Sequence, residues 1–480
     1  MAYRDIREFL KELEARGRLR RVKRPVDAAW EVAALARWLF QAVPERDRFG
    51  LYFEEVKGSR IPVMTGVLGA SRETYALALG TEPERINDAW VKALLEPRPS
   101  VRVGSAPCQE VVLQGAEVDL GTLPIPVWTP GKDAAPYLTT LTLSRDAETG
   151  IQNAATYRAM VLDAAHLAVN LPPGRHGALC LESYRRRGEP APFAWVIGAE
   201  PAVHLAAVAN VPYGVDELTI AGGLKGEPVD VVWAKTQDLY VPANAEIVIE
   251  GEIRPGEEAD EGPFGEFAGF MGPVGRRPRV TVTAITSRRD PIYYGYLSQM
   301  PPSESTVIQG LGNAGLLLKL LRHDLGHRTV ADVAIDTTYG GLLGHGTVAL
   351  RPLYPGHARQ VGRLVADVSL LKRVTVVDAD IDIRDPIHVA WAMNAHFQPQ
   401  RDTLVLEDTF TPANMDPSVR SGEGRGTGSK LVIDATQKEE AGSLSLPSRE
   451  LMERALDVWR EAGLPEFELP KRVQLLLDRA

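Results

Sequence analysis

Apolar residues near the start of the chain recur at the three- and four-residue spacing of an amphipathic helix. Ile6, Phe9 and Leu13 follow this spacing, and Gly17 marks the predicted end of the helix. Strand-like apolar runs then alternate with further helical patterns, which predicts an N-terminal α/β domain over residues 1–105. The predicted strands are Arg18–Lys23, Leu51–Glu55 and Ile61–Thr65, and the predicted helices are Glu31–Phe40 and two within Ser71–Leu95.

The pattern changes at the proline-rich segment Pro124–Pro130, because proline disfavours helices. Strand patterns then follow one another closely, which predicts a β-dominated barrel or sandwich with few helices over residues 106–300. The predicted strands are Tyr137–Ser144, Phe193–Ile197, Asp230–Trp233, Ala245–Ile253, Arg279–Ser287 and Ile292–Ser298.

Helical and strand patterns alternate again after Pro302, which predicts a C-terminal α/β domain over residues 301–445. Ser421–Ser429 has the composition of a flexible loop. An amphipathic helix at Pro447–Gly463, in a terminal segment over residues 446–480, is a candidate arm for contact with a second copy. The predicted helices of the domain are Ser305–His323, Gly356–Leu371 and Pro386–Asn394, and its strands are Val330–Ile335 and Val374–Val377.

Length and charge narrow the class of protein. The chain has 480 residues, and 63 acidic against 54 basic side chains give a formal charge of −9. This charge weighs against a nucleic-acid backbone as partner, because such binding depends on neutralising phosphates. The charged N-terminus does not resemble a signal peptide, and no apolar run reaches the roughly 20 residues of a membrane span. Cys108 and Cys180 allow one bridge, but a reduced, cytoplasmic chain is the simpler expectation.

The segment Gly310–Gly315 fits the glycine pattern of a dinucleotide-binding turn. That mechanism requires a preceding strand, so that a pyrophosphate meets the N-terminus of the following helix. Here a helix-start signal, Pro-Pro-Ser-Glu-Ser, precedes the glycines. We therefore expect these glycines inside a helix and not at a nucleotide site.

Two carboxylates flank a short turn in the segment Asp260–Phe270. Glu261 and Glu266 are separated by Gly-Pro-Phe-Gly, so a turn can bring them together. Mutual repulsion raises the pKa of one carboxyl group in such a pair, which makes it a candidate acid near neutral pH. The alternative from the pattern alone is a hairpin with two surface glutamates.

A second cluster carries donors for a divalent cation. Asn153, His176 and Glu217 supply an amide oxygen, an imidazole and a carboxylate, and phosphate oxygens can complete such a site. The three lie far apart along the chain, and His176 after Arg175 also fits an ordinary loop histidine.

Taken in order, Asn153, Arg158, His176, Glu217 and Glu261–Glu266 resemble the UbiD-like decarboxylases, which include ferulic acid and polyprenyl-hydroxybenzoate decarboxylases. The resemblance covers most of the chain. It implies an N-terminal α/β domain, a central flavin-binding split β-barrel and a C-terminal α/β domain, in agreement with the segmentation above. The further matching segments are Asp238–Ala243, Glu250–Glu252, Asp378–Asp382 and Gly428–Thr436.

The resemblance also implies roles for individual residues. Arg158, Glu261 and Glu266 match a catalytic Glu-Arg-Glu set. Asn153, His176 and Glu217 match the ligands of a Mn²⁺ or Mg²⁺ ion that holds the flavin phosphate, usually beside K⁺. The expected cofactor-binding residues are these three ligands with Arg158, Arg175 and Lys372, and either Thr139 or Thr140 is a candidate neighbour of the flavin ring.

The implied activity is the reversible, non-oxidative decarboxylation of an aromatic, heteroaromatic or α,β-unsaturated acid through a covalent adduct with prenylated FMN. Glu266 is the implied proton donor. A flavin prenyltransferase would supply the cofactor, and the enzyme would act as a homodimer or a higher homo-oligomer.

Three alternatives remain open at this stage. The first is a reductase or oxidase that uses ordinary FMN on the same barrel, and the second is a non-enzymatic subunit of a carboxylase complex. The third is a physiological role in the carboxylation direction. The substrate is also open, although Met393–Pro399, with His396, is a candidate segment of its pocket.

Overall fold

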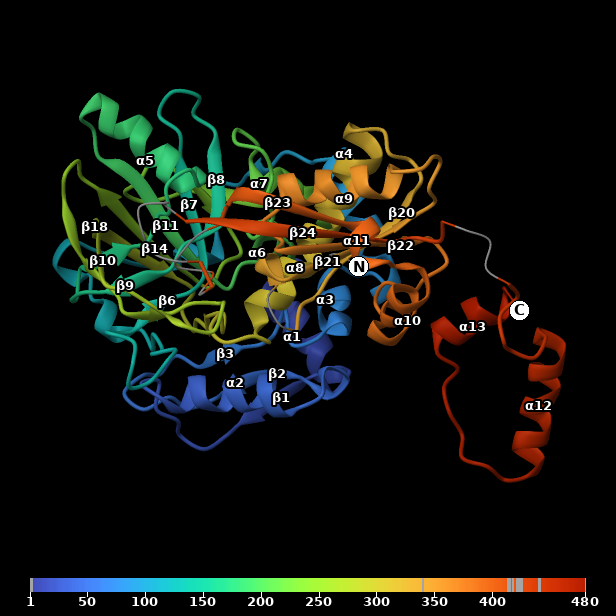
Figure 1. Ribbon diagram of the computed structural model, residues 1–480. Coiled ribbons are helices and arrows are strands. Elements are labelled where there is room, and N and C mark those ends of the chain that lie inside the picture. The colour runs from blue at the N-terminus through green and yellow to red at the C-terminus, as the bar shows by residue number, and fades with distance from the viewer. Residues whose placement is uncertain are drawn as a thin grey trace. The chain divides into compact units, whose positions relative to one another are not determined.

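The computed structural model describes residues 3–338, 341–411, 416, 418–419, 426–438 and 442–479. The chain forms two compact units (Figure 1). The first unit is built mainly from Met1–Leu316, and the second mainly from Leu342–Thr411 and Gly424–Ala480. Among the described residues, no helix has the length and apolar character needed to cross a membrane.

The N-terminal elements follow the predicted alternation. Helix α1 (Ile6–Ala15) begins where the Asp5 side chain accepts a hydrogen bond from the Glu8 N–H at 2.9 Å. A four-stranded sheet packs nearby, and its fourth strand comes from residues about 230 positions further along the chain. The sheet order is β1 (Leu19–Val22), β2 (Gly50–Phe53), β3 (Val63–Thr65) and β19 (Tyr293–Tyr294), and the helices are α2 (Glu31–Ala42), α3 (Arg72–Ala78) and α4 (Ile86–Leu95).

The central region forms a ten-stranded sheet. In the part of the chain that is described, its two end strands do not pair with each other, so the sheet is open. A split barrel therefore stays a prediction, whereas the mixed α/β fold class is confirmed. The strand order is β6 (Tyr137–Leu138), β9 (Ala159–Val161), β10 (His166–Val169), β18 (Gly275–Ser287), β14 (Ile247–Ile253), β11 (Ala191–Ile197), β7 (Leu141–Arg145) and β8 (Gln152–Thr156), while β5 (Val111–Gln114) and β15 (Glu258–Glu261) also pair with β18.

Three helices of this region were not predicted from the sequence: α5 (His176–Arg187), α6 (Pro201–Ala206) and α7 (Glu217–Lys225). Helix α7 carries Gly222 and Gly223, which resemble a turn signal. An added Cβ would lie 2.5 Å from the Arg98 carbonyl oxygen at Gly222 and 2.6 Å from the Ala93 carbonyl oxygen at Gly223. These glycines therefore serve close packing. A separate sheet contains β4 (Val101–Arg102), β12 (Asp230–Trp233) and β13 (Tyr240–Pro242).

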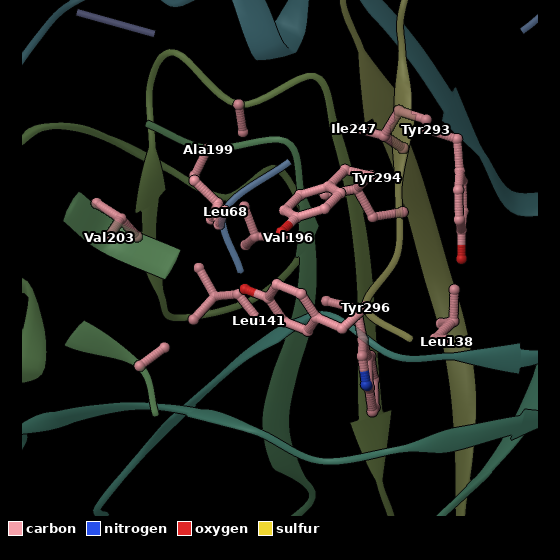
Figure 2. Close-up of a cluster of buried hydrophobic side chains, with 14 of the residues drawn as sticks. Leu68, Leu138, Leu141, Val196, Ala199, Val203, Ile247, Tyr293, Tyr294 and Tyr296 are labelled. Atoms are coloured by element: carbon pink, nitrogen blue, oxygen red, sulfur yellow. The ribbon is translucent and has the colours of Figure 1, made fainter. Parts of the chain in front are cut away.

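One hydrophobic core joins the N-terminal elements to the central sheet. Figure 2 shows Leu68 from the N-terminal region among side chains of the central strands. Tyr294 and Tyr296 lie in the same cluster. The Tyr294 hydroxyl donates to the buried Glu304 carboxylate, and the Tyr296 hydroxyl forms a hydrogen bond with buried His204. This shared core holds the central sheet rigidly against the N-terminal elements.

The second unit contains a five-stranded sheet in the order β20 (Val330–Ile335), β21 (His345–Leu350), β22 (Arg373–Asp378), β24 (Thr427–Ala435) and β23 (Thr403–Phe410). The inner pairs, β21 with β22 and β22 with β24, are parallel. Val376 of β22 lies on the side of α9 (His357–Val368), next to Gly362, and Val377 packs with Val389 of α10 (Pro386–His396). Apolar residues on both faces explain the continuous Val-rich run of β22.

The end of the chain forms α12 (Arg449–Glu461) and α13 (Lys471–Leu477), after the short α11 (Pro399–Asp402). The predicted terminal helix is confirmed by α12, which has no buried residue, and its role as an oligomer arm stays a prediction. Arg472 forms an ion pair with Asp385 at 2.6 Å. Of the predicted loop Ser421–Ser429, residues 421–425 lie outside the described residues. Residues 427–429 belong to β24, so the loop prediction is wrong there.

The glycines that resemble a nucleotide-binding motif lie inside α8 (Glu304–Lys319), as predicted. Gly312 and Gly315 pack against Trp90, whose indole N–H donates to the Tyr75 hydroxyl at 2.8 Å. A Cβ added at Gly315 would lie 2.4 Å from the Trp90 Cβ. The two cysteines, Cys108 and Cys180, are buried and unpaired in this structure, and the reduced state of the chain stays a prediction.

Replacing Gly315 by alanine should lower the free energy of unfolding by about 1–3 kcal/mol, because overpacking forces α8 away from Trp90. Gly312→Ala is the matched control, since its Cβ would lie 3.2 Å from the Trp90 ring and alanine favours helices. Urea unfolding followed by tryptophan fluorescence measures both variants. A Gly315→Ala protein as stable as Gly312→Ala would contradict the packing role.

Candidate active site

The two predicted carboxylates lie on a tight hairpin. Glu261 ends β15, and Glu266 follows β16 (Phe264–Gly265), which pairs with β17 (Met271–Gly272). Gly262 has φ +99°, a left-handed conformation that favours glycine. A Cβ at Gly272 would lie only 2.7 Å from Glu266 Oε1. The glycines between and after the two glutamates therefore allow the chain to reverse closely enough to bring both carboxylates to one place.

Arg158, in the turn between β8 and β9, contacts both carboxylates. Its Nε donates to Glu261 Oε1 at 2.9 Å and its Nη2 donates to Glu261 Oε2 at 3.2 Å. Its Nη1 donates to Glu266 Oε1 at 2.5 Å. Glu261 is fully buried, and Glu266 is 5% exposed. Charges this deeply buried are stable only when a partner of opposite charge lies close to them and forms hydrogen bonds with them.

Two aromatic side chains enclose this ion-pair cluster. The Arg158 guanidinium lies 4.8 Å from the centroid of the Phe264 ring, and the Tyr137 ring lies 4.3 Å from Phe264. The Gly262 N–H donates to the Tyr137 hydroxyl at 3.1 Å. The aromatic rings therefore exclude water from one side of the guanidinium and hold the start of the hairpin.

The electrostatic environment shifts the pKa values of two groups here. Burial lowers the pKa of the Arg158 guanidinium, but Glu266 and Glu261 raise it more, so the pKa lies above its ordinary value. Burial raises the pKa of the Tyr137 hydroxyl, and the neighbouring Glu261 raises it further. Arg158 is therefore a permanent cation and Tyr137 a neutral hydroxyl.

The predicted metal ligands converge from three elements. Asn153 lies in β8, while His176 and Glu217 are the first residues of α5 and α7. The position of His176 at a helix start excludes the alternative of a loop histidine. His176 Nδ1 lies 3.6 Å from Glu217 Oε1, and Glu217 Oε2 accepts a hydrogen bond from the Ala154 N–H at 2.7 Å. The side chains of the two helix starts thus meet beside β8.

This trio has the donors that a divalent cation requires. Asn153 is 4% exposed, and its Oδ1 has no hydrogen-bond partner among the described residues, although its Nδ2 donates to Ser144 Oγ at 3.2 Å. Burial raises the pKa of Glu217, which hydrogen bonds from His176 and the Ala154 N–H partly counteract. A buried oxygen without a donor, beside a carboxylate and an imidazole, fits Mn²⁺ or Mg²⁺.

Arg175, Thr139 and Thr140, which were also candidate neighbours of the cofactor, form hydrogen bonds with neighbouring residues. Arg175 precedes α5 and donates to Asn210 Oδ1 at 3.1 Å. Thr139 and Thr140 are buried, and their hydroxyls donate to the carbonyl oxygens of Tyr296 at 2.9 Å and Val196 at 2.7 Å. These bonds do not distinguish one threonine from the other as a neighbour of a flavin.

Lys372 and His396 belong to the second unit, so their places at the site stay predictions. Lys372 directly precedes β22. His396 is the last residue of α10, so the first part of the candidate pocket segment Met393–Pro399 is helical. The helix continues two residues beyond its predicted end at Asn394.

Sequence reasoning missed Tyr137, Phe264 and Asp133, which contact the hairpin or the arginine. Phe264 lies between the two glutamates, so its position in the motif was visible. Tyr137 and Asp133 lie more than 120 residues before the hairpin, and their contacts depend on the fold.

Comparison with known proteins finds matches along most of the chain. The family models of 3-octaprenyl-4-hydroxybenzoate carboxy-lyase match in three parts: the N-terminal domain at residues 10–94, the Rift-related domain at residues 100–301 and the C-terminal domain at residues 306–435.

Solved structures are similar over nearly their whole length. The UbiD-class enzyme HmfF from Pelotomaculum thermopropionicum, in complex with FMN, is 34% identical with a TM-score of 0.83, over 94% of this chain and 99% of that chain. An evolved dimeric form of HmfF with prFMN is 34% identical with a TM-score of 0.81, over 93% of this chain and 97% of that chain. Vanillic acid decarboxylase from Sedimentibacter hydroxybenzoicus, in closed form, is 29% identical with a TM-score of 0.85, over 96% of this chain and 100% of that chain.

Replacing Arg158 by glutamine should lower the free energy of unfolding by about 3–5 kcal/mol, because buried Glu261 loses its hydrogen-bonded cation and keeps only Arg277, whose Nε lies 4.0 Å from Glu261 Oε2. The double variant Arg158→Gln/Glu261→Gln should be more stable than Arg158→Gln, since it removes the poorly paired charge. Urea unfolding without added ligand measures both. Arg276→Gln, at a 60% exposed side chain beside Asp260, is the control and should change stability by less than about 0.5 kcal/mol. Equal stability of the single and double variants would contradict the assignment.

Proposed function

The chain belongs to the UbiD family of carboxy-lyases, and from this premise we propose that it catalyses the reversible, non-oxidative decarboxylation of an aromatic, heteroaromatic or α,β-unsaturated carboxylic acid. The observation that supports this proposal most directly is the buried contact of Arg158 with Glu261 and Glu266. A hydride-transfer enzyme has no need of such a complete carboxylate–arginine–carboxylate set.

Loss of CO2 from such an acid leaves negative charge on an sp² carbon, and no protein side chain stabilises that charge by itself. When bound, prenylated FMN supplies the electron sink. The tasks left to the protein are to orient the acid, to exclude water and to move a proton.

Arg158 performs the first task in this proposal. Its three hydrogen bonds to the glutamates do not exhaust the donors of the guanidinium, so it can also bind the substrate carboxylate. The charge of Arg158 also balances that of buried Glu261. Phe264 and Tyr137 shield this contact from water on one side.

Glu266 performs the proton transfer. Its carboxyl group protonates the carbon from which CO2 has departed, and in the carboxylation direction it removes the same proton. The single hydrogen bond from Arg158 engages Oε1 of Glu266, whereas both oxygens of Glu261 are engaged. This asymmetry supports Glu266 as the proton donor and Glu261 as the partner of Arg158.

Asn153, His176 and Glu217 would hold a Mn²⁺ or Mg²⁺ ion that neutralises the phosphate of the flavin, beside K⁺. The buried Asn153 Oδ1 without a donor and the convergence of the other two side chains support this assignment. Arg175 and Lys372 are the proposed further contacts of the cofactor. The metal has no need to touch the substrate.

The proposal includes a cytoplasmic homodimer or higher oligomer and a flavin prenyltransferase that supplies the cofactor. Co-expression with such a prenyltransferase, followed by a screen of aromatic and unsaturated acids, tests the activity. CO2 release or deuterium uptake at the carbon that carried the carboxyl group would support it. Oxidation of NADH without CO2 release, by protein whose bound flavin has the mass of FMN, would instead support a reductase.

Replacing Glu266 by glutamine should lower turnover at least ~10²-fold, because a general acid is lost while the shape of the side chain is kept. Asp260→Asn is the matched control, since its side chain is 73% exposed on the same hairpin, and it should keep most of the activity. Cofactor content is measured by absorbance before each assay. Wild-type turnover in cofactor-loaded Glu266→Gln would exclude Glu266 as the proton donor.

Replacing Glu217 by alanine should weaken the binding of Mn²⁺ at least ~10-fold and reduce the bound flavin, because the three proposed ligands lose their carboxylate. Mn²⁺ affinity is measured by calorimetry on metal-free protein, and bound flavin by absorbance. Glu182→Ala, at an exposed position of α5, is the control and should change neither. Unchanged metal and flavin occupancy in Glu217→Ala would remove Glu217 from the metal site.

A further inference from the structure

We propose that Asp133 is a positioning residue for Glu266, whose carboxylate fixes the main chain of the hairpin directly before the proton donor. This inference rests on the proposed function, in which Glu266 moves the proton. Among the described residues, Asp133 forms no hydrogen bond or ion pair with Arg158 or with either glutamate side chain, so its action is indirect.

The Asp133 carboxylate bridges two backbone segments. Its Oδ1 accepts a hydrogen bond from the Gly265 N–H at 3.0 Å, and its Oδ2 accepts one from the Thr129 N–H at 2.6 Å. Gly265 is the residue immediately before Glu266. Hydrogen bonds that involve a charged acceptor are about twice as strong as neutral ones, so this bridge is stronger than a neutral backbone hydrogen bond at the same place.

Two weaker hydrogen bonds join the same segments on either side. The Ala134 N–H donates to the Pro263 carbonyl oxygen at 3.1 Å. The Gly262 N–H donates to the Tyr137 hydroxyl at 3.1 Å. The segment from Thr129 to Tyr137 is therefore bound to the hairpin at three successive points, and at Gly265 the acceptor is the Asp133 carboxylate.

The hairpin requires this support because its own sequence allows it many conformations. Gly262 and Gly269 both have positive φ angles, +99° and +94°. Glycine samples more backbone conformations than any other residue, so a hairpin with several glycines is poorly ordered without outside contacts. Over the residues that the structure describes, the main chain of Glu266 bonds only within the hairpin: its N–H donates to the Phe270 carbonyl oxygen at 2.8 Å, and its carbonyl oxygen accepts from the Gly269 N–H at 3.0 Å.

Close packing holds Gly265 from a second side. A Cβ at this position would lie 2.5 Å from Thr129 Oγ1 and 2.6 Å from Gln299 Cγ. The main chain that follows Gln299 is in turn held by Arg37, which donates to the Met300 carbonyl oxygen at 2.7 Å. Gly265 therefore lies between the segment that carries Asp133 and the segment held by Arg37.

The opposite charges of Arg37 and Asp133 link the two segments on either side of Gly265. Burial lowers the pKa of Arg37 to about 10, and the negative charge of Asp133 acts in the opposite direction. Burial also raises the pKa of Asp133, while the N–H groups of Thr129 and Gly265 counteract this. The carboxylate thus has a cation and two N–H donors to stabilise it in its partly buried place.

Position matters for the reaction because proton transfer needs donor and acceptor at about 2.6–3.2 Å. A displacement of about 1 Å can lower a rate about 10²-fold. Loosening the peptide before Glu266 therefore affects the proton transfer and leaves the binding of the acid by Arg158 largely intact.

The first experiment measures the hairpin in protein without flavin or substrate. Asp133→Ala should raise amide hydrogen exchange at least ~10-fold in peptides that cover residues 261–272, because a charge-assisted hydrogen bond is lost. Asp133→Asn keeps one oxygen acceptor and should give an intermediate value. Asp119→Ala is the matched control, since Asp119 Oδ1 also accepts from a glycine N–H, that of Gly121 at 2.8 Å, outside the site. Unchanged exchange in Asp133→Ala would overturn the proposal.

The second experiment measures kinetics on cofactor-loaded enzyme. Asp133→Ala should lower kcat about 10- to 100-fold with KM within about twofold of wild type, and Asp133→Asn should recover part of kcat. A raised KM with unchanged kcat would overturn the positioning role. The two proposals can fail separately. If amide exchange is faster in Asp133→Ala but the wild-type enzyme releases CO2 from no acid, Asp133 does fix the hairpin main chain and the proposed function is overturned instead.

Discussion

A guanidinium buried between two carboxylates is the interaction on which the rest of this structure depends. Removing such charges from water costs several kcal/mol per ion, and only close pairing with good hydrogen bonds offsets that cost. Arg158 donates to both oxygens of Glu261 and to one oxygen of Glu266. The fold must therefore bring a turn after one strand and a distant hairpin together with an accuracy of a few tenths of an ångström.

The central sheet supplies that accuracy, and one strand connects both halves of the site. Strand β8 carries Asn153, and the chain reaches Arg158 directly after it. Tyr157, between them, accepts a hydrogen bond from the Gly177 N–H at 2.9 Å, directly after His176. A displacement of the α5 start would therefore be transmitted to the turn that holds Arg158. The proposed metal ligands and the ion-pair cluster are therefore mechanically connected.

Much of the fold was predictable from local patterns. Strand β20 has the bounds expected from its apolar run, and α1, whose buried residues Ile6, Phe9 and Leu13 form one face, ends two residues before the predicted end at Gly17. Helix α5 was missed because its buried face consists partly of small residues, Gly177, Cys180 and Ser183, which leave a weak periodic signal. Strand β19 is only two residues long, and its place beside β3 follows from packing between segments far apart in the chain.

The sequence by itself determined the chemistry of this protein, that is, which residues can carry charge, bind a cation or form a tight turn. The order of these residues along the chain also indicated the family. It did so because residue types and their spacing along the chain are local properties. Only the tertiary structure decided which groups meet. The single arginine that lies between the two glutamates, the buried Asn153 oxygen without a donor, and the bridge from Asp133 to Gly265 all join segments far apart in sequence. Such contacts arise from the packing of a whole core, which no short window of sequence contains.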